Sequence, residues 1–317
     1  MNPISSSKKN FNASFSSFNF DSSFENRLGP YLAGLIEGDG HIYTPSLLRD
    51  LKGRKIVPSI EIAFDIKDLL LFEKIKEVLG GGYITLRKNN QSGRLFIKKR
   101  TILLKLIRLI NGYMRTPKIE ALHRLIDWFN NEKGSDFIIK KSEDLSSLNS
   151  NSWLSGFLEA DGNFYLNWKL SKSKKFDFLI PTNIIYYLRL SQRQMYTRKV
   201  NSQISESNLN IMARIGYMLN TKVIEIERNR NEYLEKAYLI RTDKIESKDL
   251  MFAYLNKYPL FGYKRFALLN LEKIHELVRS KEHKTMKGKL KLIEYTSYMK
   301  YNSSIHKWEH LNIFYIN

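Results

Sequence analysis

Two aspartates, Asp39 and Asp161, close two similar segments of this 317-residue chain, and a glycine follows each of them. The segment LAGLIEGDG at residues 32–40 returns as LSGFLEADG at residues 154–162. Each copy is an apolar stretch of about two and a half helical turns at 3.6 residues per turn. We therefore predict two matching helices, opened by Pro30 and Ser152, that end at the two aspartates.

The end of each predicted helix gathers groups that attract cations. It carries the negative pole of the helix dipole, unpaired backbone carbonyls and the aspartate carboxylate. Small residues such as Gly34 and Gly156 fall on one face of each copy, so the two helices could approach backbone to backbone. Together the two ends would form an oxygen-ligand site for a divalent cation, and two related carboxylates suit a reaction on two strands.

Less chemical interpretations of the same residues stay open at this stage. A single copy of the motif would equally fit a tightly packed helix that ends at Asp-Gly. Glu37 and Glu159 lie one turn before the helix end, where they could serve as hydrogen-bonding groups of the interface or as metal ligands. The repetition of the whole motif in a basic chain favours the functional interpretation for the aspartates.

The composition points to a nucleic-acid partner. Lys and Arg number 52 against 32 Asp and Glu, which gives a net charge of +20 and a pI of about 9.8. Such a balance is typical of phosphate-binding surfaces, although ribosomal proteins and membrane-surface binders share it. The chain has no cysteine, which excludes disulfides, Cys-ligated zinc and thiol catalysis, and no apolar run reaches the roughly 18 residues of a membrane span. We therefore expect a soluble protein with no membrane partner.

The domain organisation follows from the length and the offset of the motif, since about 150 residues make one domain. We predict a mobile tail at residues 1–26, a first repeat at 27–132, a polar linker at 133–151 and a second repeat at 152–317. The second repeat would include a basic C-terminal helical extension with Tyr295, Tyr298 and Trp308 packed inward. The abundance of Phe, Tyr, Ile, Asn and Lys indicates an A/T-rich genome, so we expect an organelle, most readily the mitochondrion.

Hydrophobic periodicity predicts the same order of elements after each motif. In the first half the strands are expected at 41–47, 55–64, 83–88 and 94–98, and the helices at 68–79, 103–111 and 118–130. In the second half the strands are expected at 163–170, 183–192, 222–228 and 237–242, and the helices at 206–219, 247–256 and 263–278. The repeated unit is therefore helix, two strands, helix, two strands, helices.

Both motif copies resemble the signature of the LAGLIDADG homing endonucleases, in their single-chain form with two motifs. The resemblance covers roughly residues 27–278. It implies an α/β (α+β) fold of two pseudo-symmetric αββαββα repeats, with the motif helices at the interface and two antiparallel sheets that form a saddle over DNA. It also implies an intron-encoded monomer that hydrolyses one phosphodiester in each strand of a target of about two helical turns, leaving staggered ends.

The resemblance further implies a metal-dependent active site. Asp39, Asp161 and the carbonyls of Gly38 and Ala160 would hold Mg²⁺, for which Mn²⁺ could substitute, whereas Ca²⁺ would support binding without cleavage. A looser second repeat, residues 111–118 and 256–264, ends at two lysines that resemble a basic residue the family places near the scissile phosphates.

These lysines, Lys118 and Lys264, are candidates for stabilising transition-state charge. The alternative is that each is one exposed lysine among many. Gln192 matches a glutamine that the family often has at the end of the second strand, where it helps to hold the water network. The first half has Phe64-Asp65 at that place, so the two half-sites are expected to differ.

Solvent-facing strand residues would read base edges if the sheets enter the major groove. The alternative for each of them is an ordinary solvated strand face. The candidates are His41, Tyr43, Ser59, Glu61, Arg87 and Arg94 in the first half, and Asn163, Tyr165, Asn167, Lys169, Tyr187, Arg189 and Ser191 in the second.

Two other functions compete with cleavage. The family includes RNA maturases that assist splicing of their host intron, so intron RNA is an alternative partner. A DNA-binding regulator could keep the scaffold without cutting, but the presence of both aspartates argues against it, because pure binding has no use for carboxylates beside phosphates. An intein is disfavoured by the lack of cysteine and of a penultimate histidine.

Overall fold

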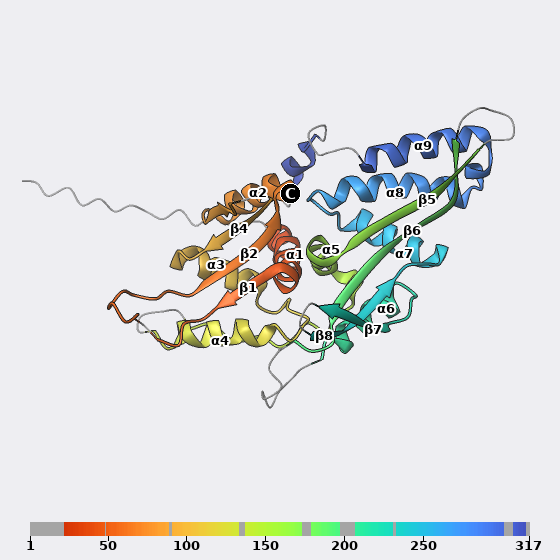
Figure 1. The fold of residues 1–317 in the computed structure, drawn as a ribbon. Helices are drawn as coiled ribbons and strands as arrows, with labels where there is room; N and C mark the ends of the chain where they lie inside the picture. Colours follow the sequence, from red (N-terminus) through yellow and green to blue (C-terminus); the bar gives the residue numbers. More distant parts are fainter. Residues whose placement is uncertain are drawn as a thin grey trace, which may run out of the picture.

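Two similar arrangements of helices and strands follow one another along the chain in the computed structural model, which describes residues 22–47, 49–88, 91–132, 137–172, 179–196, 207–230, 233–300 and 307–314 (Figure 1). The first half contains α1 (Ser22–Asp39), β1 (Gly40–Tyr43), β2 (Ser59–Asp65), the short 3-10 helix η1 (Ile66–Asp68), α2 (Leu69–Leu79), β3 (Tyr83–Leu86), β4 (Ser92–Ile97), α3 (Arg100–Ile110) and α4 (Ile119–Asn130). The second half contains α5 (Trp153–Asp161), β5 (Asn163–Lys172), β6 (Leu179–Arg193), α6 (Leu209–Met218), β7 (Ile224–Arg230), β8 (Tyr233–Arg241), α7 (Ile245–Lys257), α8 (Lys264–Arg279) and α9 (Met286–Lys300). The predicted order of elements is confirmed.

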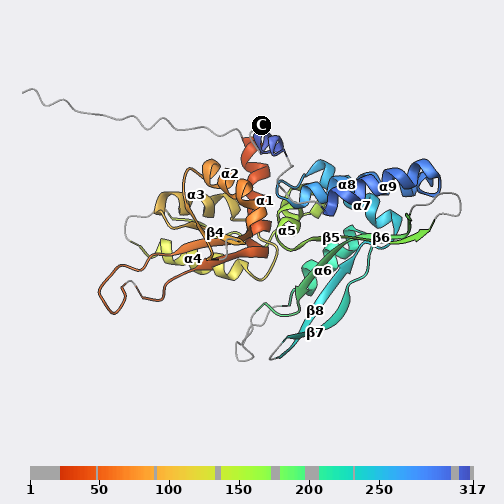
Figure 2. The ribbon, with the colours of Figure 1, turned by 45° about the horizontal axis from the view of Figure 1, so that its top comes forward.

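Each half builds a four-stranded antiparallel sheet, in the orders β1-β2-β4-β3 and β5-β6-β8-β7. The registers match between the halves, since His41 pairs with Glu61 as Asn163 pairs with Arg189. α1 and α5 lie side by side between the two sheets, and α8 and α9 lie over β5 and β6 (Figure 2). The predicted fold class, two pseudo-symmetric repeats that meet at the motif helices, is confirmed.

Alternation along the strands separates a core face from an outer face of each sheet. In the first sheet one set of alternate residues is buried against helices, and its members are Ile42, Ile60, Ile62, Leu95 and Ile97. Because successive side chains of a strand point to opposite faces, His41, Glu61 and Arg94 share the other face. The core face anchors the sheet and leaves the opposite face free for binding.

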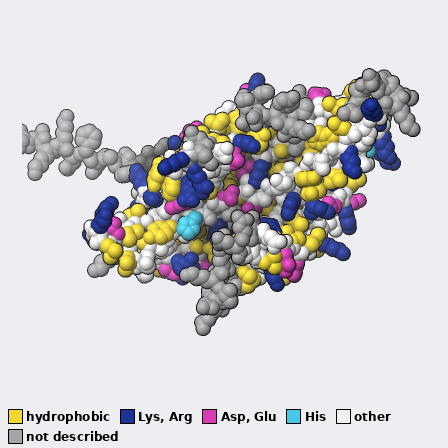
Figure 3. Space-filling view, viewed as in Figure 1, with side chains coloured by type: hydrophobic (Ala, Val, Ile, Leu, Met, Phe, Trp, Pro, Cys, Tyr) yellow, Lys and Arg dark blue, Asp and Glu magenta, His cyan; other side chains and the backbone are white. Residues whose placement is uncertain are grey.

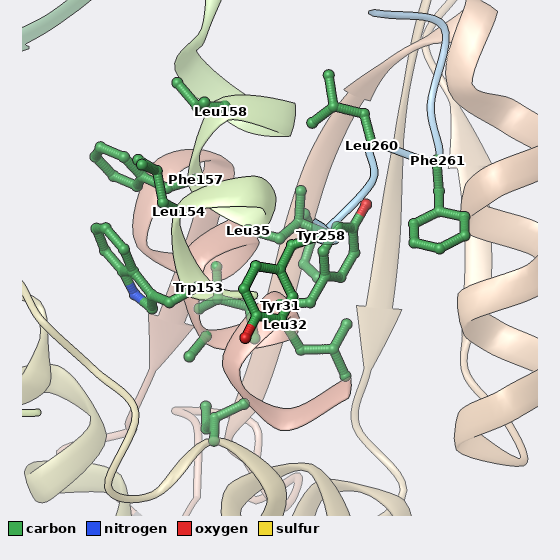
Figure 4. Packing of buried hydrophobic residues seen from close by; sticks show 14 of the residues in the cluster. Tyr31, Leu32, Leu35, Trp153, Leu154, Phe157, Leu158, Tyr258, Leu260 and Phe261 are labelled. Carbon is green, nitrogen blue, oxygen red and sulfur yellow. The ribbon is translucent and has the colours of Figure 1, made fainter. Parts of the chain in front are cut away.

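The two motif helices touch through their glycines. A Cβ placed on Gly34 would lie 2.0 Å from the carbonyl oxygen of Trp153, and one on Gly156 would lie 1.9 Å from that of Tyr31. Large side chains close around this crossing, with Trp153 stacked on Phe157 at 4.8 Å between ring centroids (Figure 4). The predicted backbone-to-backbone approach of the small residues is confirmed.

The start of α1 differs from the expectation. The helix does not open at Pro30 but at Ser22, so Pro30 lies inside it and residues 22–26 of the predicted tail are helical. Leu28 is buried, and Gly29 lies against the backbone of Leu109 in α3. Packing of this added length against α3 outweighs the one backbone hydrogen bond that a proline removes from a helix. Residues 1–21 lie outside the described part of the chain.

Several strands begin or end a few residues away from their predicted positions. The strand expected at 41–47 stops at Tyr43, and the one expected at 55–64 begins at Ser59, whereas β6 starts four residues before the predicted 183. In the predicted linker, Ile138 and Leu148 are buried and the side chain of Asn130 hydrogen-bonds both backbone groups of Ile138. The described part of the linker is therefore packed, and it also contacts the second half, where Arg214 of α6 donates to the carbonyls of Asp144 and Ser146.

The C-terminal extension is helical as expected. Tyr295 of α9 and Trp308 pack against the core, while the side chain of Tyr298 lies outside the described residues. A short 3-10 helix η5 (Glu309–Ile313) follows and brings Phe314 to the helix crossing, where its ring lies edge-on to Tyr31 and Phe261. Within the described ranges, no helix has the length and apolar character needed to cross a bilayer.

The glycine contacts predict that adding a side chain at the crossing strongly lowers the stability of the fold. We expect Gly34→Ala and Gly156→Ala each to lower the free energy of unfolding by more than about 3 kcal/mol, the upper end for ordinary overpacking, because the added methyl group meets backbone atoms that cannot rotate away. Urea unfolding measures this. The control is Gly216→Ala in α6, where the nearest atom to the added Cβ is 3.0 Å away and a smaller effect is expected. Equal effects at all three sites would contradict the assignment.

Candidate active site

The C-terminal ends of α1 and α5 bring Asp39 and Asp161 together. The point where a Gly38 side chain would begin lies 2.2 Å from Cβ of Ala160 and 2.9 Å from Oδ2 of Asp161. The pKa of Asp39 is raised to about 6, first because the surrounding protein desolvates the carboxyl and second because Asp161 is close. Burial also raises the pKa of Asp161. The predicted meeting of the two carboxylates is confirmed.

This carboxylate pair fits a divalent cation. Asp39 accepts no hydrogen bond among the described residues, and its charge is opposed by that of Asp161. A cation between them would relieve this repulsion, and carboxylate and carbonyl oxygens are ligands that Mg²⁺ accepts. In the described ranges no group of three or more His, Cys, Asp and Glu residues forms a ready metal site. The donors that a cation could use here are the two aspartates and the nearby helix-end carbonyls.

The two lysines lie against the helix ends rather than on an exposed surface. The ammonium of Lys118 donates to the carbonyls of Ile36, Glu37 and Gly40 within 3.0 Å. That of Lys264 donates to the carbonyls of Glu159 and Ala160, each at 2.7 Å. Each lysine therefore compensates the negative end of its helix, and the interpretation as one exposed lysine among many is wrong.

The carbonyls proposed as metal ligands are not alike. Lys264 occupies one acceptor direction of the Ala160 carbonyl at 2.7 Å, whereas the Lys118 ammonium is 3.4 Å from the Gly38 carbonyl. A carbonyl oxygen has two lone pairs, so both can still bind a cation. Burial lowers the pKa of Lys118, while Glu37, Asp161 and Asp39 oppose that shift.

Glu37 and Glu159 hold the turns that carry these lysines. Glu37 accepts hydrogen bonds from the backbone N–H groups of Arg115 and Thr116, from the Thr116 hydroxyl and from the indole of Trp153. Burial raises its pKa to about 7 despite these donors.

The second half repeats this arrangement. Glu159 accepts hydrogen bonds from the N–H groups of Phe261 and Gly262 and from the Tyr31 hydroxyl. Tyr31 and Trp153 each reach from one motif helix to the glutamate of the other. Both glutamates are therefore hydrogen-bonding groups of the interface. The residues that donate their backbone N–H groups to them were not singled out from the sequence, and they occupy matching places before the two lysines.

The predicted difference between the half-sites is visible in the second strands. The side chain of Gln192 donates to Oδ2 of Asp161 at 2.7 Å. From the matched registers, the counterpart of Gln192 is Phe64, which is buried and stacks on Phe72 at 4.2 Å between centroids. Asp65 accepts from the N–H of Lys67 and starts η1. Only Asp161 therefore receives an amide donor from its strand.

The candidate DNA-reading residues lie mostly on the outer sheet faces. His41, Arg87, Arg94, Asn163, Asn167, Lys169 and Arg189 are exposed, Tyr43 and Tyr165 are each more than a third exposed, and Glu61, Tyr187 and Ser191 are half-buried. Ser59 shares the outer face by register but is only 1% exposed, and its hydroxyl points to Glu61. The expectation of a solvent-facing Ser59 is therefore wrong, because strand alternation does not reveal what covers a strand end.

Register also adds basic residues to the outer face of the second sheet. Arg241 pairs with Arg189, its guanidinium lies 4.8 Å from the ring centroid of Tyr187, and Arg228 pairs with Glu235 further along the same face. Lys and Arg side chains are spread over both halves of the face seen in Figure 3. Alternation within β7 and β8 would have identified these arginines once their pairing was known.

Comparison with known proteins agrees with this geometry. The model of the LAGLIDADG endonuclease family matches residues 32–129 and 154–275, one segment for each repeat. The chain belongs to the LAGLIDADG endonuclease family. It is 31% identical over 281 residues to the intron-encoded DNA endonuclease aI3 of Saccharomyces cerevisiae, which covers 82% of this chain and 66% of that protein.

Two other curated relatives extend the picture. A cox1 intron-2 protein of Schizosaccharomyces pombe is 25% identical, with 83% of this chain and 70% of that protein covered. The intron-encoded RNA maturase bI4 of Saccharomyces cerevisiae is 30% identical over 146 residues, which are 45% of this chain and 20% of that protein. The chain thus spans just under two thirds of aI3 and a fifth of bI4.

Solved structures share the fold. The meganuclease I-SmaMI bound to uncleaveable DNA has a TM-score of 0.58 at 16% identity, covering 84% of this chain and 97% of that one. The homing endonuclease I-GzeII in complex with its DNA target has the same score and identity, with coverage of 88% and 99%. A further I-SmaMI structure, with a TM-score of 0.57 and coverage of 86% and 99%, is described as bound to uncleaved DNA in the presence of calcium ions.

The raised pKa of Asp39 predicts how pH governs cation binding. Because this carboxyl keeps its proton up to about pH 6, protons compete with the cation below that pH. We expect Ca²⁺ affinity, measured by isothermal titration calorimetry, to be constant from pH 8 to 7 and to fall by up to about tenfold per pH unit below 6. Asp39→Asn serves as the control, since it should bind weakly with a shallower pH dependence. A flat wild-type profile between pH 7 and 5 would contradict this site.

Proposed function

We propose that this protein is a site-specific homing endonuclease that cuts both strands of a DNA duplex by metal-dependent hydrolysis and leaves staggered ends. The observation that carries the proposal is the pair of carboxylates, Asp39 and Asp161, held side by side at the ends of α1 and α5, where the surrounding protein and their mutual repulsion raise the pKa of Asp39. Two mutually repelling carboxylates, partly shielded from water, lower the stability of a protein unless a cation binds between them. A basic chain with two exposed sheet faces supports DNA as the substrate.

Each residue of the site has a chemical task in this proposal. Asp39, Asp161 and the carbonyls of Gly38 and Ala160 would hold Mg²⁺, which supplies activation of water and stabilisation of the departing 3′ oxygen. Gln192 orients Asp161 through its amide. Lys118 and Lys264 place positive charge beside the carboxylates, where negative charge would develop on a phosphate, and Glu37 and Glu159 hold the turns that carry them.

The outer sheet faces supply recognition. Their exposed side chains would contact base edges and phosphates along about two helical turns of DNA. Both carboxylates belong to one chain, so a monomer contains a complete pair of half-sites. The relatives named as intron-encoded, one of them for a cox1 intron, support an intron-encoded protein of the mitochondrion.

A second candidate function is assistance of intron splicing. The match to the RNA maturase bI4 favours it, and it is compatible with cleavage because a maturase would use RNA-binding surfaces rather than the carboxylate pair. Splicing of a host intron transcript with and without the protein separates the two activities.

The carboxylates provide the decisive test of cleavage. Incubation of a randomised duplex library with the protein and Mg²⁺, followed by sequencing of cut ends, would recover the target and the stagger. On that target we expect Asp39→Asn and Asp161→Asn each to lower the single-turnover rate by about 10³-fold or more, because each removes a charged ligand. Affinity for the target in Ca²⁺ should stay within about fivefold, since neither residue makes a recognition contact.

The matched control for this test is Asp65→Asn, which changes a carboxylate outside the site. Cutting of both strands by either active-site variant at the wild-type rate would remove the carboxylates from the mechanism. Library binding without any cutting by the wild type would favour a regulator or a maturase.

The lysines are expected to act on one strand each. Lys118→Met or Lys264→Met keeps the aliphatic stem and removes the ammonium, so we expect cleavage of one strand to slow by about 10²-fold, the scale for loss of one preorganised charge, and nicked DNA to accumulate. The slope of the logarithm of DNA affinity against the logarithm of salt concentration should become shallower by about one unit. Strand-resolved gels measure the rates. If both variants cut normally and only bind more weakly, the lysines are ordinary phosphate contacts.

A further inference from the structure

A carboxylate of the first half reaches the start of the helix that carries Lys264. Oδ1 of Asp68, the last residue of η1, accepts a hydrogen bond from the backbone N–H of Tyr263 at 2.5 Å. Tyr263 precedes α8, and Lys264 is the first residue of that helix. The ammonium of Lys67 lies 4.9 Å from the centroid of the Tyr263 ring, so η1 contacts this residue twice. A negative charge at a helix start is also favoured by the helix dipole.

The turn before Lys264 is held between two carboxylates, one from each half. A side chain on Gly262 would begin 2.5 Å from Oδ1 of Asp68 and 2.6 Å from Oε1 of Glu159. Glu159 takes the N–H groups of Phe261 and Gly262, and Asp68 takes the next one, that of Tyr263. Three successive backbone donors are thereby fixed immediately before the lysine.

In the first half, the turn before Lys118 is held without a counterpart of the Asp68 carboxylate. There Glu37 takes the N–H groups of Arg115 and Thr116, but the next residue is Pro117, which has no N–H and whose ring fixes φ near −65°. Its counterpart Tyr263 has a φ of −56°, close to that of proline. Counting on from the matched strand positions, Tyr196 stands where the first half has Asp68.

We propose that Asp68 is a positioning residue for Lys264 and does across the interface what Pro117 does within the first half. The inference rests on the proposed nuclease function, in which each lysine serves one strand. It makes the turn before Lys264 dependent on a hydrogen bond to the other half, whereas Pro117 leaves no N–H to be satisfied at the matching place before Lys118. The two strands should therefore respond differently to the loss of Asp68.

Strand-resolved single-turnover cleavage tests this proposal. We expect Asp68→Ala to slow, by about tenfold or more, the same strand that Lys264→Met slows, because misplacement of a catalytic group by about 1 Å costs up to 10²-fold. The other strand should stay within about twofold of the wild type. Asp68→Asn keeps an acceptor for the Tyr263 N–H and should recover most of the rate. Tyr263→Pro added to Asp68→Ala should also restore rate, because it removes the unpaired donor and fixes φ.

Controls separate positioning from general damage to the fold. Asp65→Ala removes the side chain that starts the same η1 helix, where it accepts from Lys67 N–H at 2.9 Å, and should leave the ratio of the strand rates unchanged. Equal slowing of both strands by Asp68→Ala, or an Asp68→Asn variant as slow as Asp68→Ala, would overturn the proposal.

Amide hydrogen exchange gives a readout that does not need cleavage. Asp68→Ala should speed exchange in a peptide spanning residues 260–268 and leave the matching peptide, residues 114–122, unchanged. If the wild type cuts neither strand, the proposed function fails, and the exchange data alone still decide whether Asp68 holds the turn. Unchanged exchange at 260–268 would overturn the inference even if cleavage is found.

Discussion

Backbone contact between α1 and α5 is the constraint on which the rest of the structure depends. The carbonyl of Trp153 occupies the space beside Gly34, and the carbonyl of Tyr31 occupies the space beside Gly156. No side chain longer than hydrogen fits at either position without a shift of a helix. This distance sets the separation of the two helix ends, and through the strands that follow directly it also sets where the two sheets lie relative to each other.

The same close approach brings negative charges together, and several groups of the site compensate them. Two carboxylates and the negative ends of two helix dipoles meet where the surrounding protein partly removes water from the carboxyl groups, which raises the pKa of both aspartates. Lys118 and Lys264 compensate the helix-end carbonyls, and Glu37 and Glu159 hold the turns before these lysines through backbone N–H groups. What is left uncompensated is the space between Asp39 and Asp161, where a cation would bind.

Much of this could be predicted from the sequence because the informative features occur twice, in the same order, in the two halves. The duplicated motif predicted both helices, their contact through small residues and the meeting of the aspartates, and hydrophobic periodicity predicted the order of elements in each half. The family resemblance singled out Gln192 and the different residues, Phe64-Asp65, at that place in the first half, and the structure adds the hydrogen bond from Gln192 to Asp161. Local periodicity sufficed here because each repeat buries one face of each element.

The features that were missed depend on tertiary contacts that local patterns do not report. Pro30 was taken as a helix start because local rules do not include packing against α3, and Ser59 was taken as exposed because alternation does not report what covers a strand end. The hydrogen bond from Tyr263 to Asp68 joins residues 195 positions apart, and no local pattern indicates it. Pro117 is visible in the sequence. Its structural role could be inferred only after the structure showed that the N–H group of its counterpart, Tyr263, needs an acceptor.

The central claim is that the two motif helices form a single composite cation site. Anomalous diffraction from crystals of the protein bound to its DNA target and soaked in Mn²⁺ tests it directly, because the ion positions are then located independently of any assumed ligand. We predict that Mn²⁺ lies between the ends of α1 and α5, with oxygens of both Asp39 and Asp161 within about 2.5 Å of bound ions. Manganese bound to only one of these aspartates, or only elsewhere on the protein, would contradict the account.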